Sequence, residues 1–213
     1  MDTKGKILKA AVRLYNKDGL SNVTSRHIAA ALKISHGNLE YHFPNKESLL
    51  IAIYQRMSDD MSRYYPEHKE DILNPIEHLH RLLVRLEDFQ TEYKFFCMDL
   101  IDTCRKYEKV NQLLVNNMQI RKGQMVKFFE KFLELGYMKN ESTAGYYERL
   151  QHTIRILLTF WKPQEIVVAN SDFNVKGEMV RHIWDLLLPH FTEKGRTALE
   201  NVLKKFTKPS SGK

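Results

Sequence analysis

The sequence predicts an all-α protein in which three short N-terminal helices precede a larger helical bundle. Apolar residues recur at spacings of three and four along almost the whole chain of 213 residues, and this is the period of an amphipathic helix. The only strand-like run, residues 165–168, is too short to build a sheet, and strands do not alternate with helices anywhere.

Four helices are expected in the first 63 residues. Gly19 suits the left-handed residue that ends the first helix, whereas Thr24, Ser35 and Asn45 are suitable N-cap residues for the three that follow. These signals place the helices at about residues 3–17, 24–32, 35–43 and 46–63.

The remainder of the chain predicts longer helices. Apolar residues repeat from 76 to 105, which predicts one long helix with a possible kink. Gly136, Pro163 and Pro189 are expected to end later helices. The other helices are expected at about residues 108–118, 120–135, 142–162, 175–188 and 192–206. We therefore predict domains at 1–46 and 47–206, followed by a loose tail at 207–213.

The composition is that of a soluble globular protein, with 43 % hydrophobic and 28 % charged residues. No apolar run reaches the roughly 18 residues of a membrane span, and no apolar signal core follows the N-terminus, so we expect a cytoplasmic protein. Cys97 and Cys104 are seven residues apart, which on one helix separates them by about 10 Å, too far for a disulfide. We interpret both as reduced core residues.

The net charge of +7 is concentrated at the two ends of the chain. Residues 1–47 carry a net charge of +4 and residues 194–213 a net charge of +5, whereas residues 48–193 carry −2. Basic ends favour contact with an anionic polymer such as nucleic acid, although many basic termini are only solvated.

The predicted helices 24–32 and 35–43, joined by Lys33 and Ile34, have the lengths of a helix-turn-helix. In this motif the second helix enters the major groove of DNA and its N-terminal turns touch base edges. Gly37 leaves space for the backbone to approach a phosphate or a base. Lys46 and the free N–H groups of the next helix suit a phosphate. Residues that can lock the two helices together are Ile28, Ala29, Leu32, Ile34, Leu39 and Phe43, and outward hydrogen-bonding residues are Ser35, His36, Asn38, Tyr41 and His42.

The run TSRHIAAALKISHGNLEYHFPNKESLL, residues 24–50, closely resembles the DNA-binding domain of the TetR/AcrR family of bacterial transcriptional regulators. The preceding helix, KILKAAVRLYNKDGL, fits as well, and the resemblance is specific over about residues 4–55. The rest of the chain, here called the body, matches only in being helical and of suitable length. The matching positions are Thr24, Ile28, Ala29, Ser35, Gly37, Leu39, Tyr41, His42, Phe43, Lys46, Glu47 and Leu49, with Ala10, Leu14, Gly19 and Val23 upstream.

The resemblance implies a homodimer that binds a palindromic double-stranded DNA operator and acts as a repressor, with a small-molecule effector in the body and no metal or cofactor. Together with the outward face of the helix-turn-helix, it makes the following residues our candidate DNA contacts: Thr24, Ser25, Arg26, Ser35, His36, Gly37, Asn38, Tyr41, His42 and Lys46. It also places the dimer interface on the predicted helices 142–162 and 175–188, where the candidates are Tyr147, Leu150, Ile154, Leu157, Trp161, Met179, Ile183, Trp184 and Leu187. The same stripes are also compatible with an intramolecular core.

Aromatic and methionine residues are frequent between residues 89 and 138. Such side chains tolerate varied shapes, so they could line an apolar effector pocket, or they could simply be core. The pocket candidates are Phe89, Tyr93, Phe96, Met118, Met125 and Phe128.

Two positions depart from the family pattern. Lys33 stands where the family usually has glycine, so a left-handed backbone there would be strained. Glu40 stands where the family usually has tyrosine. Because phosphates repel a carboxylate, we expect Glu40 to point aside toward Lys33 or Arg26, or to accept from a cytosine amino group.

Other functions have weaker support in the sequence. His78 and His80 are two apart and face different sides of a helix, which argues against a metal site. Asp99 and Asp102 are interpreted as a solvated helix face. The sequence lacks a nucleophile elbow, a phosphate-binding loop and a dinucleotide fingerprint, which argues against an enzyme. The remaining alternative is a helical adaptor protein without sequence-specific DNA binding.

Overall fold

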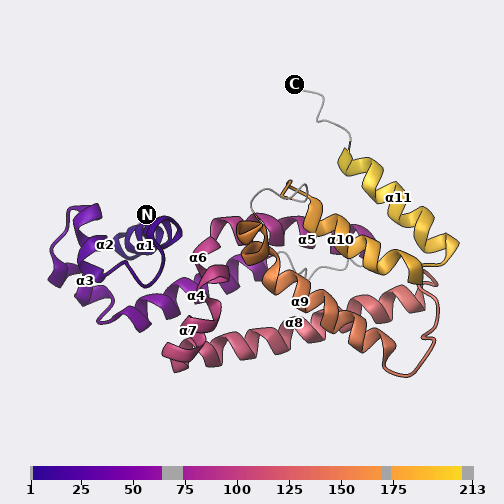
Figure 1. Cartoon of the computed structure of the whole chain (residues 1–213), viewed down its shortest axis with the longest axis horizontal. Coiled ribbons are helices and arrows are strands. Elements are labelled where there is room, and N and C mark those ends of the chain that lie inside the picture. Colours follow the sequence, from indigo (N-terminus) through magenta and orange to yellow (C-terminus); the bar gives the residue numbers. More distant parts are fainter. Residues whose placement is uncertain (1, 64–73, 169–173, 208–213) are drawn as a thin grey trace. The chain divides into compact units, whose positions relative to one another are not determined.

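The computed structural model describes residues 2–63, 74–168 and 174–207. It confirms the all-α prediction (Figure 1), and in the described residues the only strand-like pairing is an isolated bridge between Met138 and Phe191. Within these ranges no helix combines the length and the apolar character that a membrane crossing requires. The elements are α1 (Thr3–Asp18), α2 (Ser25–Leu32), α3 (His36–His42), α4 (Lys46–Ser62), α5 (Pro75–Glu92), α6 (Lys94–Met98), α7 (Leu100–Lys106), α8 (Glu108–Glu134), α9 (Tyr146–Val167), α10 (Glu178–Leu187), the 3-10 helix η2 (Leu188–His190) and α11 (Glu193–Thr207).

The chain divides into two compact units. The N-terminal unit contains residues 1–63 and 90–119, and the C-terminal unit contains residues 64–89 and 120–213. This division follows contacts within the chain, and two of its limits fall inside α5 and α8. The boundary expected at residue 46 separates functions instead, and it stays a prediction. The predicted tail beyond Thr207 lies outside the described residues.

The first four helices begin where the sequence predicts, because their N-caps are local. The Thr24 side chain accepts from the backbone N–H of His27, whose ring accepts from the N–H of Thr24, both at 3.4 Å. Ser35 and Asn45 accept in the same way from the N–H groups three residues later, at 3.1 and 2.8 Å. Each cap satisfies a backbone donor that has no partner within its helix.

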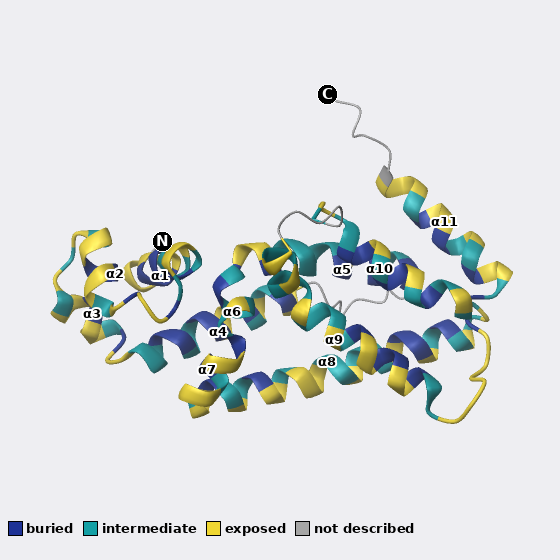
Figure 2. Ribbon diagram, in the orientation of Figure 1, coloured by how far each residue is buried: buried dark blue, intermediate teal, exposed yellow. Residues whose placement is uncertain are grey.

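The helices α1, α2 and α3 share a small apolar core. Ile7, Ile28 and Leu39 are fully buried, and Phe43 is nearly so. Burying an aliphatic or phenyl side chain of this size contributes roughly 1.5–3 kcal/mol. Figure 2 shows that the exposed residues of α2 and α3 lie largely on the sides turned away from α1, so the core fixes which face of α3 is presented to solvent.

The prediction of one long helix over residues 76–105 is wrong, because three helices, α5, α6 and α7, occupy this segment. Asn16, near the end of α1, supplies the partners at the first break. Its side-chain amide donates to the carbonyl of Glu92 at 2.8 Å, and its side-chain oxygen accepts from the N–H of Phe95 at 2.9 Å. Backbone groups that would be unsatisfied at a helix break therefore pair with a residue far away in the sequence.

The second break falls at Asp99, whose carboxylate accepts from the N–H of Leu20 at 3.0 Å. Asp99 is therefore not part of a solvated face, whereas Asp102 is exposed as expected. The break also places Cys97 in α6 and Cys104 in α7, so the two do not share one helix. Neither cysteine forms a disulfide, both are half-buried, and burial raises the pKa of Cys104.

Two other predicted helix limits are also wrong. α8 is a single helix over Glu108–Glu134, where two helices were expected at about 108–118 and 120–135. α9 likewise continues through Pro163 for four more residues, to Val167.

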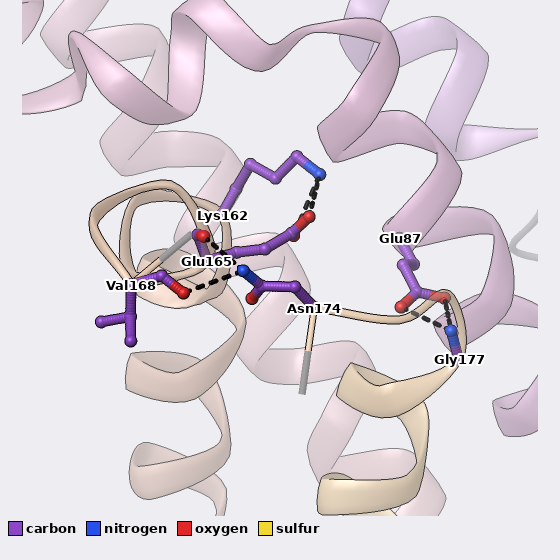
Figure 3. Close-up of polar contacts among 6 residues, drawn as sticks. All are labelled: Glu87, Lys162, Glu165, Val168, Asn174 and Gly177. Carbon is purple, nitrogen blue, oxygen red and sulfur yellow. Dashed lines mark hydrogen bonds and ion pairs between the residues drawn. The ribbon is translucent and has the colours of Figure 1, made fainter. Parts of the chain in front are cut away.

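The helical turn after Pro163 is held by contacts from a later segment (Figure 3). The side-chain amide of Asn174 donates to the carbonyls of Glu165 and Val168, at 3.0 and 2.9 Å. Lys162 adds an ion pair to Glu165 at 3.0 Å. These hydrogen bonds satisfy carbonyls that the end of α9 leaves without intrahelical partners.

The start of α10 is fixed by a carboxylate from α5. Both oxygens of Glu87 lie 2.9 Å from the N–H of Gly177, which immediately precedes α10 (Figure 3). Burial raises the pKa of Glu87 against the opposing effect of these hydrogen bonds. A carboxylate at this position also interacts favourably with the positive end of the helix dipole.

The C-terminal helix α11 packs on α5 through an aromatic cluster. The ring of Phe206 lies 4.5 Å from that of His80, which accepts a hydrogen bond from the Trp184 indole at 3.2 Å. Lys205 pairs with Glu77 at 2.8 Å beside this cluster. Burial lowers the pKa of His80, which favours the neutral ring that acts as the acceptor.

Lys33 ends α2 in the left-handed conformation, with φ 55° and ψ 40°, and no other non-glycine residue in the described ranges has a positive φ. The backbone is therefore left-handed at the position where the family usually has glycine, and the strain that follows from it stays a prediction. A residue with a Cβ costs roughly 1–2 kcal/mol in this conformation.

Replacing Lys33 with glycine should raise the free energy of unfolding by about 0.5–1 kcal/mol, because relief of strain exceeds the added entropy of the unfolded chain. Urea denaturation followed by circular dichroism measures the change. Lys9→Gly is the matched control: Lys9 is an exposed lysine inside right-handed α1, and glycine there should destabilise by about 1 kcal/mol. A Lys33→Gly protein no more stable than the wild type contradicts the strain.

Candidate nucleic-acid interface

The candidate recognition surface is the outer face of α3, the face opposite its buried Leu39. Gly37 and Tyr41 lie at its centre, because they are two residues from Leu39 on either side and a helix turns about 100° per residue. Tyr41 is 85 % exposed, and its ring meets the His42 ring edge-on with centroids 5.3 Å apart. A side chain so exposed can reach another molecule that approaches this face.

Gly37 opens this face to close approach. A Cβ built at Gly37 would meet no atom of the protein within 4 Å. The absence of a side chain is therefore not required by packing within the chain, and the space lies open to an outside partner. This agrees with the interpretation that Gly37 lets a phosphate or base approach the backbone.

Polar side chains flank the centre of the face. Asn38 is exposed and His42 half-exposed on one flank, whereas His36 and Glu40 occupy the other. The expectation that Glu40 turns toward Lys33 or Arg26 is not met: its carboxylate lies 3.5 Å from Nδ1 of His36, one turn earlier on the same helix.

The predicted contacts at the start of α2 and α3 are also near the surface. Thr24, Arg26 and Ser35 are exposed, and Ser25 is half-exposed. The Thr24 and Ser35 oxygens accept the capping hydrogen bonds, which leaves each hydroxyl proton available to donate to a phosphate. The assignment of these residues to DNA contact stays a prediction.

Lys46 is held within the protein. Its ammonium donates to the carbonyls of Leu20 and Val23, the latter at 2.8 Å, and lies 5.5 Å from the centre of the Tyr15 ring. Its pKa is lowered, first by burial and then by the nearby Lys106, while Asp99 acts in the opposite direction. Lys46 thus joins the first turn of α4 to the segment between α1 and α2, in addition to any phosphate contact.

Sequence reasoning missed the residues that support this interface from behind. Asn16 of α1 binds the backbone of Glu92 and Phe95, and Asp99 binds the N–H of Leu20 just after α1. The first residue was not singled out, and the second was interpreted as solvated. Their signal was weak, since a polar residue at the edge of an amphipathic stripe looks like any surface position.

The predicted pocket residues are dispersed. Phe96 alone among them lines a cavity of about 10 Å³, described below. Tyr93 is buried and its hydroxyl donates to Asp60 at 3.3 Å, whereas Met118 is 45 % exposed. Phe128 is buried against His78, and Phe89 and Met125 are half-buried. Among the described residues no group of three or more His, Cys, Asp or Glu could hold a metal ion.

The predicted dimer residues lie mainly inside the chain's own core. Seven of the nine are buried, namely Tyr147, Leu150, Ile154, Met179, Ile183, Trp184 and Leu187, and only Leu157 and Trp161 are half-exposed. The intramolecular interpretation therefore applies to the buried seven, because they leave almost no surface for a second chain. The outward apolar residues of α9 are instead Ile156, Phe160 and Val167, with exposures of 49, 47 and 80 %.

A helix-turn-helix with an exposed polar and aromatic second helix, on an all-α chain, defines a DNA-binding regulator. Residues 7–53 match the model described as bacterial regulatory proteins, tetR family, and residues 56–199 match the model described as bacterial transcriptional repressor. The chain belongs to the TetR family. Regulators of this family are transcription factors and not enzymes.

Individual relatives agree with this assignment. The chain is 21 % identical over 201 residues to the HTH-type transcriptional repressor NicS of Pseudomonas putida, covering 87 % of this chain and 91 % of that protein. A TetR-family regulator from Marinobacter aquaeolei VT8 has the same fold, with a TM-score of 0.80, 24 % identity and coverage of 96 and 98 %. The fold is also that of SmeT in its triclosan complex, with a TM-score of 0.64, 14 % identity and coverage of 90 and 92 %.

Replacing Lys46 with methionine should lower the free energy of unfolding by about 1–3 kcal/mol, because the carbonyls of Leu20 and Val23 lose their donor. Urea denaturation of the full chain measures the loss. Lys9→Met, at an exposed lysine of α1, is the control and should change stability by less than about 0.5 kcal/mol. Equal stability of the two variants contradicts a structural role for Lys46.

Proposed function

We propose that this TetR-family protein is a cytoplasmic one-component repressor that binds a palindromic operator as a homodimer and responds to a small molecule. The observation that carries the proposal is the outer face of α3, on which Tyr41 stands 85 % exposed beside the open position Gly37. In a helix-turn-helix this face enters the major groove, where side chains read base edges.

The proposed sensor is the apolar core of the N-terminal unit. Its cavity of about 10 Å³ has room for about one water molecule, so an effector must separate the surrounding helices to enter. Tyr54 of α4 and Phe96 of α6 face each other there, with ring centroids 5.6 Å apart. The residues that line the cavity are Leu50, Ile53, Tyr54, Met57, Phe95, Phe96, Thr103 and Val110.

Entry of a ligand at this position would act on DNA binding through α4 and α6. Lys46 ties α4 to the segment between α1 and α2, and Asn16 ties the start of α6 to the end of α1. A ligand that favours one arrangement of these helices shifts the population of binding-competent dimers. Since half-sites lie about 34–36 Å apart or a multiple of it, a small change in the separation of the recognition helices weakens binding. The triclosan complex of SmeT supports a small-molecule ligand for this fold.

The proposed dimer contact is the outward face of α9. Ile156 and Phe160 are four residues apart, so they lie on one side of the helix, and Val167 continues the exposed apolar surface toward its C-terminal end. Exposed apolar residues in a continuous patch favour association with a complementary surface. A second copy of the same helix provides such a surface in a two-fold dimer.

Replacing Tyr41 with alanine should lower the affinity for a selected palindromic duplex about tenfold or more, because a contact to base edges is lost. The salt dependence should not change, because Tyr41 carries no charge. Fluorescence anisotropy at two salt concentrations measures both, with Tyr137→Ala, a tyrosine outside the helix-turn-helix, as the control. If the wild type binds no duplex, or Tyr41→Ala binds equally well, the adaptor alternative is favoured.

Replacing Ile156 with aspartate should convert the dimer to a monomer at micromolar concentration, because a carboxylate is then buried against the second copy. Sedimentation velocity measures the change. Ile101→Asp is a closely matched control, because Ile101 in α7 is 48 % exposed and Ile156 is 49 % exposed. A monomeric wild type, or an Ile156→Asp protein that remains dimeric, overturns the proposed interface.

A further inference from the structure

The outer face of α3 carries one acidic side chain, Glu40, on the flank shared with His36. The Glu40 side chain is 51 % exposed, and its carboxylate oxygen Oε2 lies 3.5 Å from Nδ1 of His36, whose side chain is 37 % exposed. The pair spans one helical turn, so it lies along the axis of α3 beside Gly37 and Tyr41.

The surroundings of Glu40 indicate what its carboxylate can bind on a duplex. An ionised carboxylate only accepts hydrogen bonds, and the phosphates of DNA repel it. Its partner must therefore be a base-edge donor in the groove. Guanine and thymine present acceptors there, whereas cytosine presents its N4 amino group and adenine presents N6 beside the acceptor N7. Cytosine is the base whose major-groove edge donates without an adjacent acceptor that would repel the second carboxylate oxygen.

We propose that Glu40 is a specificity-determining residue that selects cytosine at one position of each operator half-site, and that His36 is its positioning residue. The proposal rests on the operator binding proposed above. His36 holds the Oε2 atom on the flank of α3 and leaves Oε1 to accept from the base. When Nδ1 of His36 carries a proton, its contact with Oε2 reduces the repulsion that an isolated carboxylate meets near phosphates.

The experiment compares duplexes selected from one random double-stranded pool by the wild type, by Glu40→Gln and by the control Asp59→Asn. A glutamine side chain both donates and accepts, and so it matches adenine N6 and N7. The wild-type palindrome should contain a cytosine in each half-site that Glu40→Gln replaces with adenine. Asp59→Asn removes the same charge from an exposed site on α4, and it should select the wild-type bases.

Affinities for fixed duplexes give the magnitude. Changing that cytosine should weaken wild-type binding roughly tenfold, a usual effect of one mismatched base pair, and should not weaken binding of Glu40→Gln in the same way. If Glu40→Gln selects the same bases as the wild type, operator binding stands and the assignment of Glu40 is wrong. If the wild type enriches no sequence, operator binding and the assignment both fail.

The role of His36 has a separate readout. His36→Ala should reduce the discrimination between cytosine and the other bases at the Glu40 position, and His36→Gln should restore it, because its amide can also donate to the carboxylate. A loss of affinity that is equal for all four bases, without rescue by glutamine, shows that His36 does not position Glu40.

Discussion

Two hydrogen bonds to the backbone of Leu20 connect the helices of the N-terminal unit. The N–H of Leu20 donates to the carboxylate of Asp99, and its carbonyl accepts from the ammonium of Lys46. Two side chains of opposite charge, one from the α6–α7 break and one from the start of α4, thus hold the same residue. Hydrogen bonds to charged groups contribute roughly 1.5–3 kcal/mol each. The joint at Leu20 therefore connects the segment after α1 to α4 and to the α6–α7 break.

Asn16 adds two hydrogen bonds to these contacts. It pairs with backbone groups on both sides of the α5–α6 break. These hydrogen bonds hold the break beside the end of α1. Because α6 also supplies Phe95 and Phe96 to the wall of the small cavity, a change in this wall is connected to α1 through hydrogen bonds as well as through packing. Such a network of discrete contacts supplies a physical route for the coupling that we propose between the cavity and α3.

The sequence predicts those features whose causes are local. Thr24 and Ser35 cap their helices with hydrogen bonds to residues three positions away, and the left-handed turn at Lys33 follows from the geometry of a helix end. Features with distant causes were not predictable: α9 passes Pro163 because Asn174 satisfies its last carbonyls. An apolar stripe likewise predicts that Ile154 and Met179 are covered, but it does not tell whether the chain itself or a second copy covers them.

The joint at Leu20 also limits how this protein can be recombined with its relatives. A recognition segment taken as residues 1–46 would leave Asp99 behind, together with the backbone groups that Asn16 binds. In a chimera with the rest of a relative's chain, Asn16 and Leu20 would face a helix break with other side chains and other spacing, so these hydrogen bonds would be lost. A chimera that keeps residues 92–99 with the first four helices retains the contacts of Asn16 and Leu20, so the transplantable module is discontinuous in the sequence.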